Sequence, residues 1–203
     1  PFYGTWDVSQ GHKGEHTHKN EWKHAWDFVI LNNKKSQFKN NGDFPEDYFC
    51  FSKPVIAPEE GVIEKIVNNI DDNIIGEVNL NNNWGNTIII KHDDEVYSKL
   101  SHLKKGSIKV TEGEKVKYGQ IIGECGNSGR SPYPHLHFQI QEYPFIGSET
   151  KDYPISAYIV HNQNSYAFNS HKRPLSDEKV SNIEANELLS KAYKFIPGQI
   201  LKY

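Results

Sequence analysis

Short strand-like runs constrain the fold of this chain more than any other feature of its sequence. They are rich in β-branched and aromatic residues or alternate apolar with polar ones, and glycine, proline, asparagine or aspartate bounds each of them. The runs span residues 24–30, 61–70, 85–92, 95–103, 120–125 and 135–141. Regular short strands separated by turn signals predict an all-β fold with an antiparallel sheet core.

The pattern changes after about Pro144, where the chain becomes less regular. Residues 181–193 then show helical periodicity, and a strand-like end follows them. We expect residues 1–144 to form a β-domain and residues 145–203 to form a short C-terminal extension that contains this helix and packs on the same domain. A chain of 203 residues can bury a sizeable core without staples.

Composition excludes several classes of function. The formal net charge of −3 offers no basic footprint for nucleic acid, and no apolar run is long enough to cross a bilayer. The chain begins at Pro1 and contains no methionine, so we expect an upstream segment to have been removed. Cys50 and Cys125 could form a disulfide, which suits an oxidising compartment, or remain two buried free thiols.

Histidine is over-represented, with 10 residues in 203, and it is the commonest metal ligand in proteins. The most informative segment is Pro134-His135-Leu136-His137-Phe138. Residues two apart in a strand point to the same face, so His135 and His137 would project together, with Leu136 and Phe138 on the opposite, apolar face. Two imidazoles on one face make half of a metal site. The alternative is a polar face that carries two histidines by chance.

Two further segments contain candidate residues. Asp27 lies in a run of aromatic residues, where a carboxylate is costly to bury unless it is paired or metal-bound. An aspartate with two histidines suits zinc, and His16 and His18 lie shortly upstream. Asp27 could instead be a structural carboxylate that accepts main-chain N–H bonds. His102 ends an alternating strand, and taken alone it indicates only a surface or hydrogen-bonded histidine.

Taken together, the segments carry a family resemblance. The sequence reads YSKLSHL at residues 97–103, VTEGEKVKYGQIIG at 110–123 and PHLHF at 134–138. This order and spacing resemble the lysostaphin/LytM-type zinc metallopeptidases. The earlier strands of that family are similar to two further segments, VIAP at 55–58 with GVI at 61–63, and GNTIII at 85–90. The resemblance covers roughly Gln10 to Gln141, about two-thirds of the chain.

The resemblance implies a single zinc ion bound by His18, Asp27 and His137. Three protein ligands leave a fourth position open, which is the pattern of catalytic zinc. It also implies that His102 and His135 are catalytic and do not bind the ion, and that they serve as acid, base or oxyanion stabiliser.

The N-terminal ligands depart from the commonest form of the family, which spaces them as HxxxD. The residue four before Asp27 is Lys23, whose ammonium cannot bind zinc. A variant of the family has Q-G-x-x-G-x-[ST]-H, a longer loop and then Y-A-x-D-F. This chain resembles that variant at Gln10-Gly11, Gly14, Thr17-His18 and His24-Ala25-Trp26-Asp27-Phe28. The resemblance therefore favours His18 as the ligand, with His16 as its main rival. The weaker candidates are His12 and His24.

The activity implied by the resemblance is zinc-dependent hydrolysis of cross-links or stem peptides of bacterial peptidoglycan. We expect a monomer that acts in the cell envelope, extracellular or periplasmic, on peptidoglycan peptides and not on nucleic acid. Candidate substrate contacts are Asn127, Ser128 and Trp22. The segment between Gly126 and Gly129 could equally be a tight turn that needs glycine.

Two other classes of function stay open from the sequence. One is a catalytically inactive zinc-binding module of the same fold, with a regulatory or cell-wall-binding role. The other is a carbohydrate-binding or adhesion β-domain, whose structural metal would be closed by four protein ligands. The identity of the peptide bond cleaved is not encoded in any motif that we can interpret.

Overall fold

The computed structural model describes residues 1–92, 96–163 and 165–183 of the chain. Every strand pairing within these residues is antiparallel, which confirms the predicted all-β fold. The helical elements in this part of the chain are two short 3-10 turns, η1 (Asn20–Trp22) and η2 (Pro45–Asp47).

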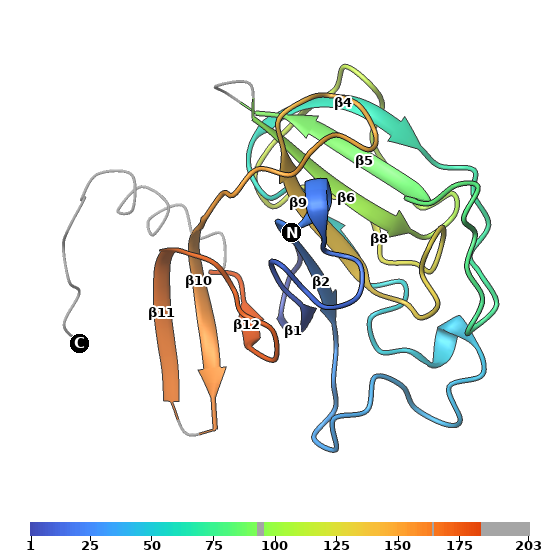
Figure 1. The fold of residues 1–203 in the computed structure, drawn as a ribbon, viewed down its shortest axis with the longest axis vertical. Helices are drawn as coiled ribbons and strands as arrows, with labels where there is room; N and C mark the ends of the chain where they lie inside the picture. Colours follow the sequence, from blue (N-terminus) through green and yellow to red (C-terminus); the bar gives the residue numbers. More distant parts are fainter. Residues whose placement is uncertain (93–95, 164, 184–203) are drawn as a thin grey trace.

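The strands of the described residues form two sheets. They are β1 (Thr5–Gln10), β2 (Ala25–Val29), β3 (Pro54–Ile56), β4 (Gly61–Val67), β5 (Asn86–Lys91), β6 (Tyr97–Leu103), β7 (Lys115–Val116), β8 (Ile121–Glu124), β9 (Leu136–Gln141), β10 (Ile155–Asn162), β11 (Ser165–Lys172) and β12 (Lys179–Ser181). The large sheet has the order β11-β10-β12-β1-β2-β9-β6-β5-β4-β7, and β3 pairs with β8 in the small one (Figure 1). β2, β9 and β6 are therefore neighbours in the middle of the large sheet.

Alternation along β9 separates the two faces of the large sheet. Leu136 and Phe138 belong to the hydrophobic core, whereas His137 points to the opposite face, as the PHLHF pattern predicted. The small sheet contributes Val55 and Ile122 to the same core. Each fully buried side chain of this size contributes roughly 1.5–3 kcal/mol of hydrophobic stabilisation. The apolar face of β9 thus packs in the core, and its other face carries the polar side chains that can form a functional site.

Strands β10, β11 and β12 extend the large sheet beyond β1, as Figure 1 shows. β12 pairs with β1 in a register that places Ser181 opposite Thr5. The helix expected at residues 181–193 falls outside the described residues except at its start, where Ser181 is the last residue of β12. The division of the chain into residues 1–144 and 145–203 stays a prediction.

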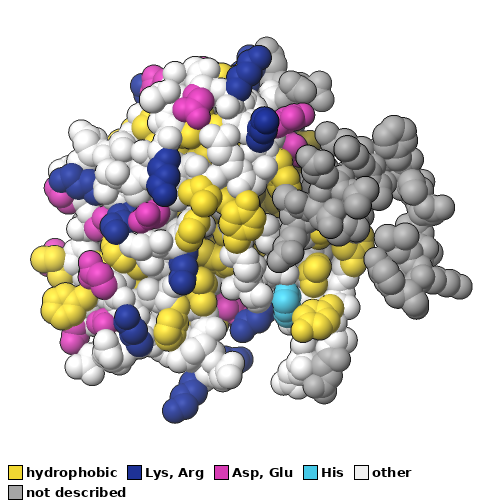
Figure 2. Space-filling model, turned by 180° about the vertical axis from the view of Figure 1, so that it is seen from behind, with side chains coloured by type: hydrophobic (Ala, Val, Ile, Leu, Met, Phe, Trp, Pro, Cys, Tyr) yellow, Lys and Arg dark blue, Asp and Glu magenta, His cyan; other side chains and the backbone are white. Residues whose placement is uncertain are grey.

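Both cysteines are free and buried, so the free-thiol alternative is the one the structure shows. The thiol of Cys50 donates to the carbonyl oxygen of Pro134 at 3.1 Å, and burial raises the pKa of Cys125. On the face drawn in Figure 2, basic and acidic side chains are interspersed. The described residues include no helix with the length and apolar character needed to span a bilayer.

Candidate functional site

Asp27 and His137 face each other across two neighbouring strands. They occupy directly opposed positions of β2 and β9, so their side chains leave the sheet on the same face. Nδ1 of His137 lies 2.8 Å from Oδ1 of Asp27, and both side chains are buried. Two candidate ligands separated by 110 residues are therefore brought together by the register of the sheet.

His18 reaches the same carboxylate from the segment between β1 and β2. Its Nδ1 lies 2.8 Å from the carbonyl oxygen of Gly11, and its Nε2 lies 3.3 Å from Oδ1 of Asp27. His16 is exposed, and its main-chain N–H donates to Gln10. The structure therefore brings His18, and not its rival His16, to Asp27.

The two weaker candidates form a separate group. The rings of His12 and His24 have their centroids 5.2 Å apart, and Nδ1 of His12 lies 3.6 Å from a carboxylate oxygen of Asp152. Burial and the charge of His24 lower the pKa of His12 to about 4. Neither ring joins the group around Asp27.

His18, Asp27 and His137 can each offer one ligand atom, and the three atoms lie within 4.8 Å of one another. Because the Gly11 carbonyl can only accept, Nδ1 of His18 donates to it, and in the neutral ring Nε2 keeps a lone pair. That Nε2 is buried and has no hydrogen-bond partner. A buried nitrogen lone pair beside a carboxylate oxygen is the arrangement expected where a cation binds between them.

The electrostatics of the group also favour a cation. Burial raises the pKa of Asp27, but the charge of His135 and the contacts of His137 and His18 hold it well below its usual range. Burial lowers the pKa of His18, but the nearby Asp27 carboxylate outweighs this effect and raises it. A buried carboxylate flanked by two imidazoles must be neutralised by protons or by a metal ion. Two imidazole nitrogens and one carboxylate oxygen are donors that zinc accepts, so these residues fit that ion.

Gln10, at the end of β1, holds the second oxygen of Asp27. Its Nε2 donates to Oδ2 of Asp27 and to Oγ1 of Thr17, both at 2.8 Å, and its Oε1 accepts from two main-chain amides of the following loop. A Cβ atom at Gly14 would lie 2.2 Å from Cγ of Gln10, so the glycine makes room for this side chain. Sequence reasoning quoted Gln10 and Gly14 as parts of a motif but gave them no role.

His102 and His135 lie beside the group, with their ring centroids 4.7 Å apart. Nδ1 of His102 donates to the carbonyl of Ser128 at 2.7 Å, and Nδ1 of His135 lies 2.9 Å from the carbonyl of Tyr133. A carbonyl only accepts, so each neutral ring keeps its lone pair on Nε2. Nε2 of His135 lies 3.7 Å from Oδ1 of Asp27. The structure thus gathers all five predicted histidine and aspartate side chains in one place.

His102 has a left-handed backbone conformation, with φ of 62°. Such conformations are uncommon outside glycine and cluster at functional sites. Main-chain hydrogen bonds hold it: its N–H donates to Trp84 at 3.2 Å, and its carbonyl accepts from Gly126 at 3.1 Å. Burial, together with the charges of His135 and His137, lowers the pKa of His102 well below its usual range. The ring is therefore neutral near pH 7 and can accept a proton.

The predicted substrate contacts Asn127 and Ser128 are fully buried. The side chain of Asn127 donates to the carbonyl of Asn73 at 3.1 Å, and that of Ser128 donates to the carbonyl of Leu103 at 2.7 Å. In the structure, these side chains stabilise the turn whose Ser128 carbonyl accepts from His102. A contact between either side chain and a substrate stays a prediction.

Trp22, the third predicted contact, is half-buried and packs edge-on against Trp84, with centroids 5.3 Å apart. Trp84 in turn lies 5.4 Å from the ring of His137. Beneath Trp84 lies the fully buried Nζ of Lys99, 2.9 Å from the ring centroid and without a hydrogen-bond partner. Sequence reasoning missed Trp84, which ends an asparagine-rich loop, and Lys99, which looks like any polar residue of an alternating strand.

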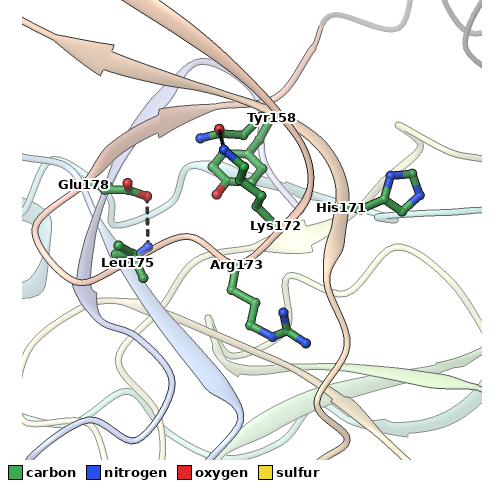
Figure 3. Close-up of a pocket in the computed structure, with 7 residues that line it drawn as sticks. Tyr158, His171, Lys172, Arg173, Leu175 and Glu178 are labelled. Atoms are coloured by element: carbon green, nitrogen blue, oxygen red, sulfur yellow. Dashed lines mark hydrogen bonds between the residues drawn. The ribbon is translucent and has the colours of Figure 1, made fainter. Parts of the chain in front are cut away.

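A separate hollow lies on the C-terminal strands (Figure 3). Tyr158, Lys172, Arg173 and Glu178 are among its lining residues, and it includes none of the predicted site residues. Lys172 donates to Asn169 at 3.0 Å, and Arg173 pairs with a neighbouring carboxylate. The basic groups of this hollow therefore already have partners.

Comparison with known proteins places most of this site within one family. The profile described as "Peptidase family M23" matches residues 47–152, just over half of the chain. The match includes His102, His135 and His137. His18 and Asp27 precede it, so the longer loop of the N-terminal ligands lies outside the matched span.

Two curated proteins show the likeness in sequence. The peptidoglycan DD-endopeptidase ShyC of Vibrio cholerae is 37% identical over 86 residues, which is 42% of this chain and 17% of that protein. The glycyl-glycine endopeptidase ALE-1 of Staphylococcus capitis is 42% identical over 69 residues, which is 34% of this chain and 18% of that protein. The match therefore spans less than a fifth of either relative.

A solved structure shows the likeness in fold. Pseudoalterin, a metalloprotease from the deep sea that its description assigns to the same family, superposes with a TM-score of 0.51 at 17% identity. The likeness covers 90% of this chain and 95% of that one.

Proposed function

The chain belongs to peptidase family M23, and from that premise we propose that it is a zinc-dependent endopeptidase that hydrolyses peptide cross-links or stem peptides of bacterial peptidoglycan. Support comes from the two curated relatives, whose names describe peptidoglycan and glycyl-glycine endopeptidases. On this proposal the protein acts as a monomer in the bacterial cell envelope.

The proposed zinc ligands are Nε2 of His18, Oδ1 of Asp27 and Nδ1 of His137. The single observation that carries the proposal is that these three atoms converge while their partners on the far side are already fixed. Zinc held by three protein ligands supplies Lewis acidity, which polarises a scissile carbonyl and lets water ionise near neutral pH. The second oxygen of Asp27 stays with Gln10, so the carboxylate cannot rotate away.

His102 and His135 then move protons. His102 suits the role of general base because burial keeps its ring neutral and the Ser128 carbonyl leaves Nε2 free to accept. His135 projects its Nε2 towards the ligand group from the other side; once that nitrogen has taken up a proton, the imidazolium can donate a hydrogen bond to the developing oxyanion or pass the proton to the leaving amine. Because both rings are kept in place, we favour the enzyme over an inactive module.

The decisive experiment incubates the zinc-loaded protein with two defined substrates and follows the products by mass spectrometry. One is a muropeptide dimer linked through D-alanine and diaminopimelate, and the other carries a pentaglycine bridge. Cleavage of either one supports the proposal and identifies the bond. The His135→Ala variant is the matched control, which should bind zinc and leave both substrates whole. If the wild-type protein with bound zinc cleaves neither cross-links nor stem peptides, the proposed activity is wrong.

A further inference from the structure

His137, Gln139 and Gln141 project from the same face of β9, and their buried side chains form one continuous series of hydrogen bonds. Nε2 of His137 lies 2.9 Å from Oε1 of Gln139, and Nε2 of Gln139 donates to Oε1 of Gln141 at 3.0 Å. Nε2 of Gln141 donates to the carbonyls of Tyr143 and Phe145, at 2.6 and 3.1 Å. The series runs from a proposed zinc ligand to the turn that follows β9.

The direction of every bond in this series is determined by its far end. The carbonyls of Tyr143 and Phe145 can only accept, so Gln141 must present its amide N–H groups to them and its oxygen to Gln139. That oxygen also only accepts, so Gln139 must present N–H to Gln141 and its own oxygen to His137. Nε2 of His137 must therefore carry a proton, and Nδ1 is the nitrogen left to face a metal ion.

We propose that Gln139 and Gln141 are positioning residues: a directional relay that fixes His137 as the Nε2–H tautomer and so presents Nδ1 as the ligand atom. This role rests on the proposed zinc site. Turning either amide round would set two acceptors or two donors against each other in a buried place, which leaves polar atoms unpaired. Partners of this kind around a ligating histidine fix its tautomer and orientation.

The turn at the end of the relay is itself held in place. The main-chain N–H of Tyr143 donates to Oγ of Ser148 at 3.2 Å, and the N–H of Ser148 donates to the carbonyl of Phe145 at 3.3 Å. The indole N–H of Trp22 donates to the carbonyl of Gly147 at 3.1 Å. Because the turn is closed on itself and tied to Trp22, the two carbonyls that orient the relay have fixed positions.

The relay can be tested first in the unaltered protein. A long-range proton–nitrogen correlation spectrum of zinc-loaded protein with 15N-labelled histidine reports which ring nitrogen carries a proton. The His137 signals are identified by their loss in a His137→Gln variant. We expect a proton on Nε2 and none on Nδ1. A proton on Nδ1 would overturn the relay even if zinc is bound.

Substitutions test whether the relay matters for metal binding, with zinc affinity measured by competition against a chromophoric chelator. Gln139→Leu should weaken zinc binding about 10–100-fold, the usual cost of losing such a partner. Gln141→Leu should weaken it less, because Gln139 can still reach His137. Gln139→Glu should lose less affinity than Gln139→Leu, because a carboxylate still accepts from Nε2 of His137, although its other oxygen would meet the accepting oxygen of Gln141.

Gln120→Leu is the matched control. Gln120 lies outside the relay, and its Nε2 donates to Glu114 at 3.2 Å, so its loss should leave zinc affinity unchanged. If Gln139→Leu and Gln120→Leu bind zinc alike, the relay has no positioning role, although the zinc enzyme would stand. If the wild-type protein binds no zinc, the proposed function fails and the relay with it. A Gln139→Glu variant as weak as Gln139→Leu would also contradict the relay.

Discussion

The ring of His102 is oriented by a main-chain atom, the carbonyl oxygen of Ser128, which lies 2.7 Å from its Nδ1. Ser128 is itself immobilised, because its hydroxyl donates to the carbonyl of Leu103 at 2.7 Å and accepts from the N–H of Asn86 at 2.9 Å. A fully buried serine thus links the end of β6, the start of β5 and the proposed base. The orientation of the base therefore depends on the fold of two strands and a turn.

Replacing His102 should remove catalysis and spare the metal. His102→Asn is the best substitution, because asparagine tolerates the left-handed conformation that His102 adopts. We expect kcat to fall about 10²–10⁴-fold, the usual contribution of a general base, with zinc affinity and thermal stability nearly unchanged. Steady-state kinetics and zinc titration check this.

His171→Asn is the matched control, because His171 is also a histidine with positive φ, 51°, but is exposed on β11. It should keep full activity. Equal losses in the two variants would mean that backbone strain, and not proton transfer, explains the effect.

Removing zinc should lower both activity and stability. Without the ion, the carboxylate of Asp27 and the lone pair of His18 are left without a metal between them. Zinc at 100 times its Kd stabilises a protein by about 2.7 kcal/mol, which for a domain of this size raises Tm by roughly 5–10 °C. Calorimetry before and after chelation, and after zinc is restored, measures the shift. If chelation changes neither the Tm nor the activity, the proposed metal site is wrong.

Gly14→Ala should weaken zinc binding indirectly, through Gln10. The new methyl group would meet Cγ of Gln10 at 2.2 Å and displace the side chain that holds Oδ2 of Asp27. We expect about a 10–100-fold loss of zinc affinity in a folded protein. Gly123→Ala is the control, because its nearest neighbour, Leu103, would lie at 3.6 Å, an ordinary contact. Unchanged affinity in Gly14→Ala would show that Gln10 does not position Asp27.

Lys99→Met should stabilise the protein. Lys99 is fully buried, its Nζ has no hydrogen-bond partner, and methionine can keep the contact with the ring of Trp84. Leaving such a group unpaired costs on the order of 1–3 kcal/mol, which the substitution should recover at neutral pH. Urea denaturation of both proteins measures the difference.

The stability gained by Lys99→Met should decrease as the pH rises. Burial lowers the pKa of Lys99 well below its usual 10.5, so between the two values the unfolded chain binds more protons than the folded one. The contribution of Lys99 to the free energy of unfolding of the wild type therefore becomes more favourable as the pH rises to about 10.5. The Lys99→Met variant has no such contribution. The advantage of the variant should shrink as the pH is raised. A constant advantage would mean that packing, and not the amine, is responsible.

Local pattern was enough to find the centre of the fold. All six predicted runs contain a strand, because turn residues bound them and alternation or β-branching marks them. The two-residue strand β7 was missed, and so were β1, β10, β11 and β12. Their sequences mix polar residues with aromatics, as in the largely exposed β11, so no clear alternation marks them.

The proposed ligands and catalytic residues could be predicted from the sequence, but the residues that hold them in position could not. His137 and Asp27 carry signals in the chain, a paired-histidine strand and a carboxylate among aromatics. The choice of His18 over His16 came from the family resemblance and not from the residues alone, because it depends on the path of a loop. Gln139 and Gln141 look like ordinary polar residues of a strand, and only the side-chain positions along β9 show that their amides meet.

The pairing of β12 with β1 has a consequence for any attempt to shorten this protein or to fuse it to another domain. A fragment ended near residue 144 would lose the hydrogen bond from Gly11 to Ser176, beside the carbonyl that orients His18. It would also turn β1, which carries Gln10, into an open edge able to recruit other chains. A fusion should therefore be joined after β12.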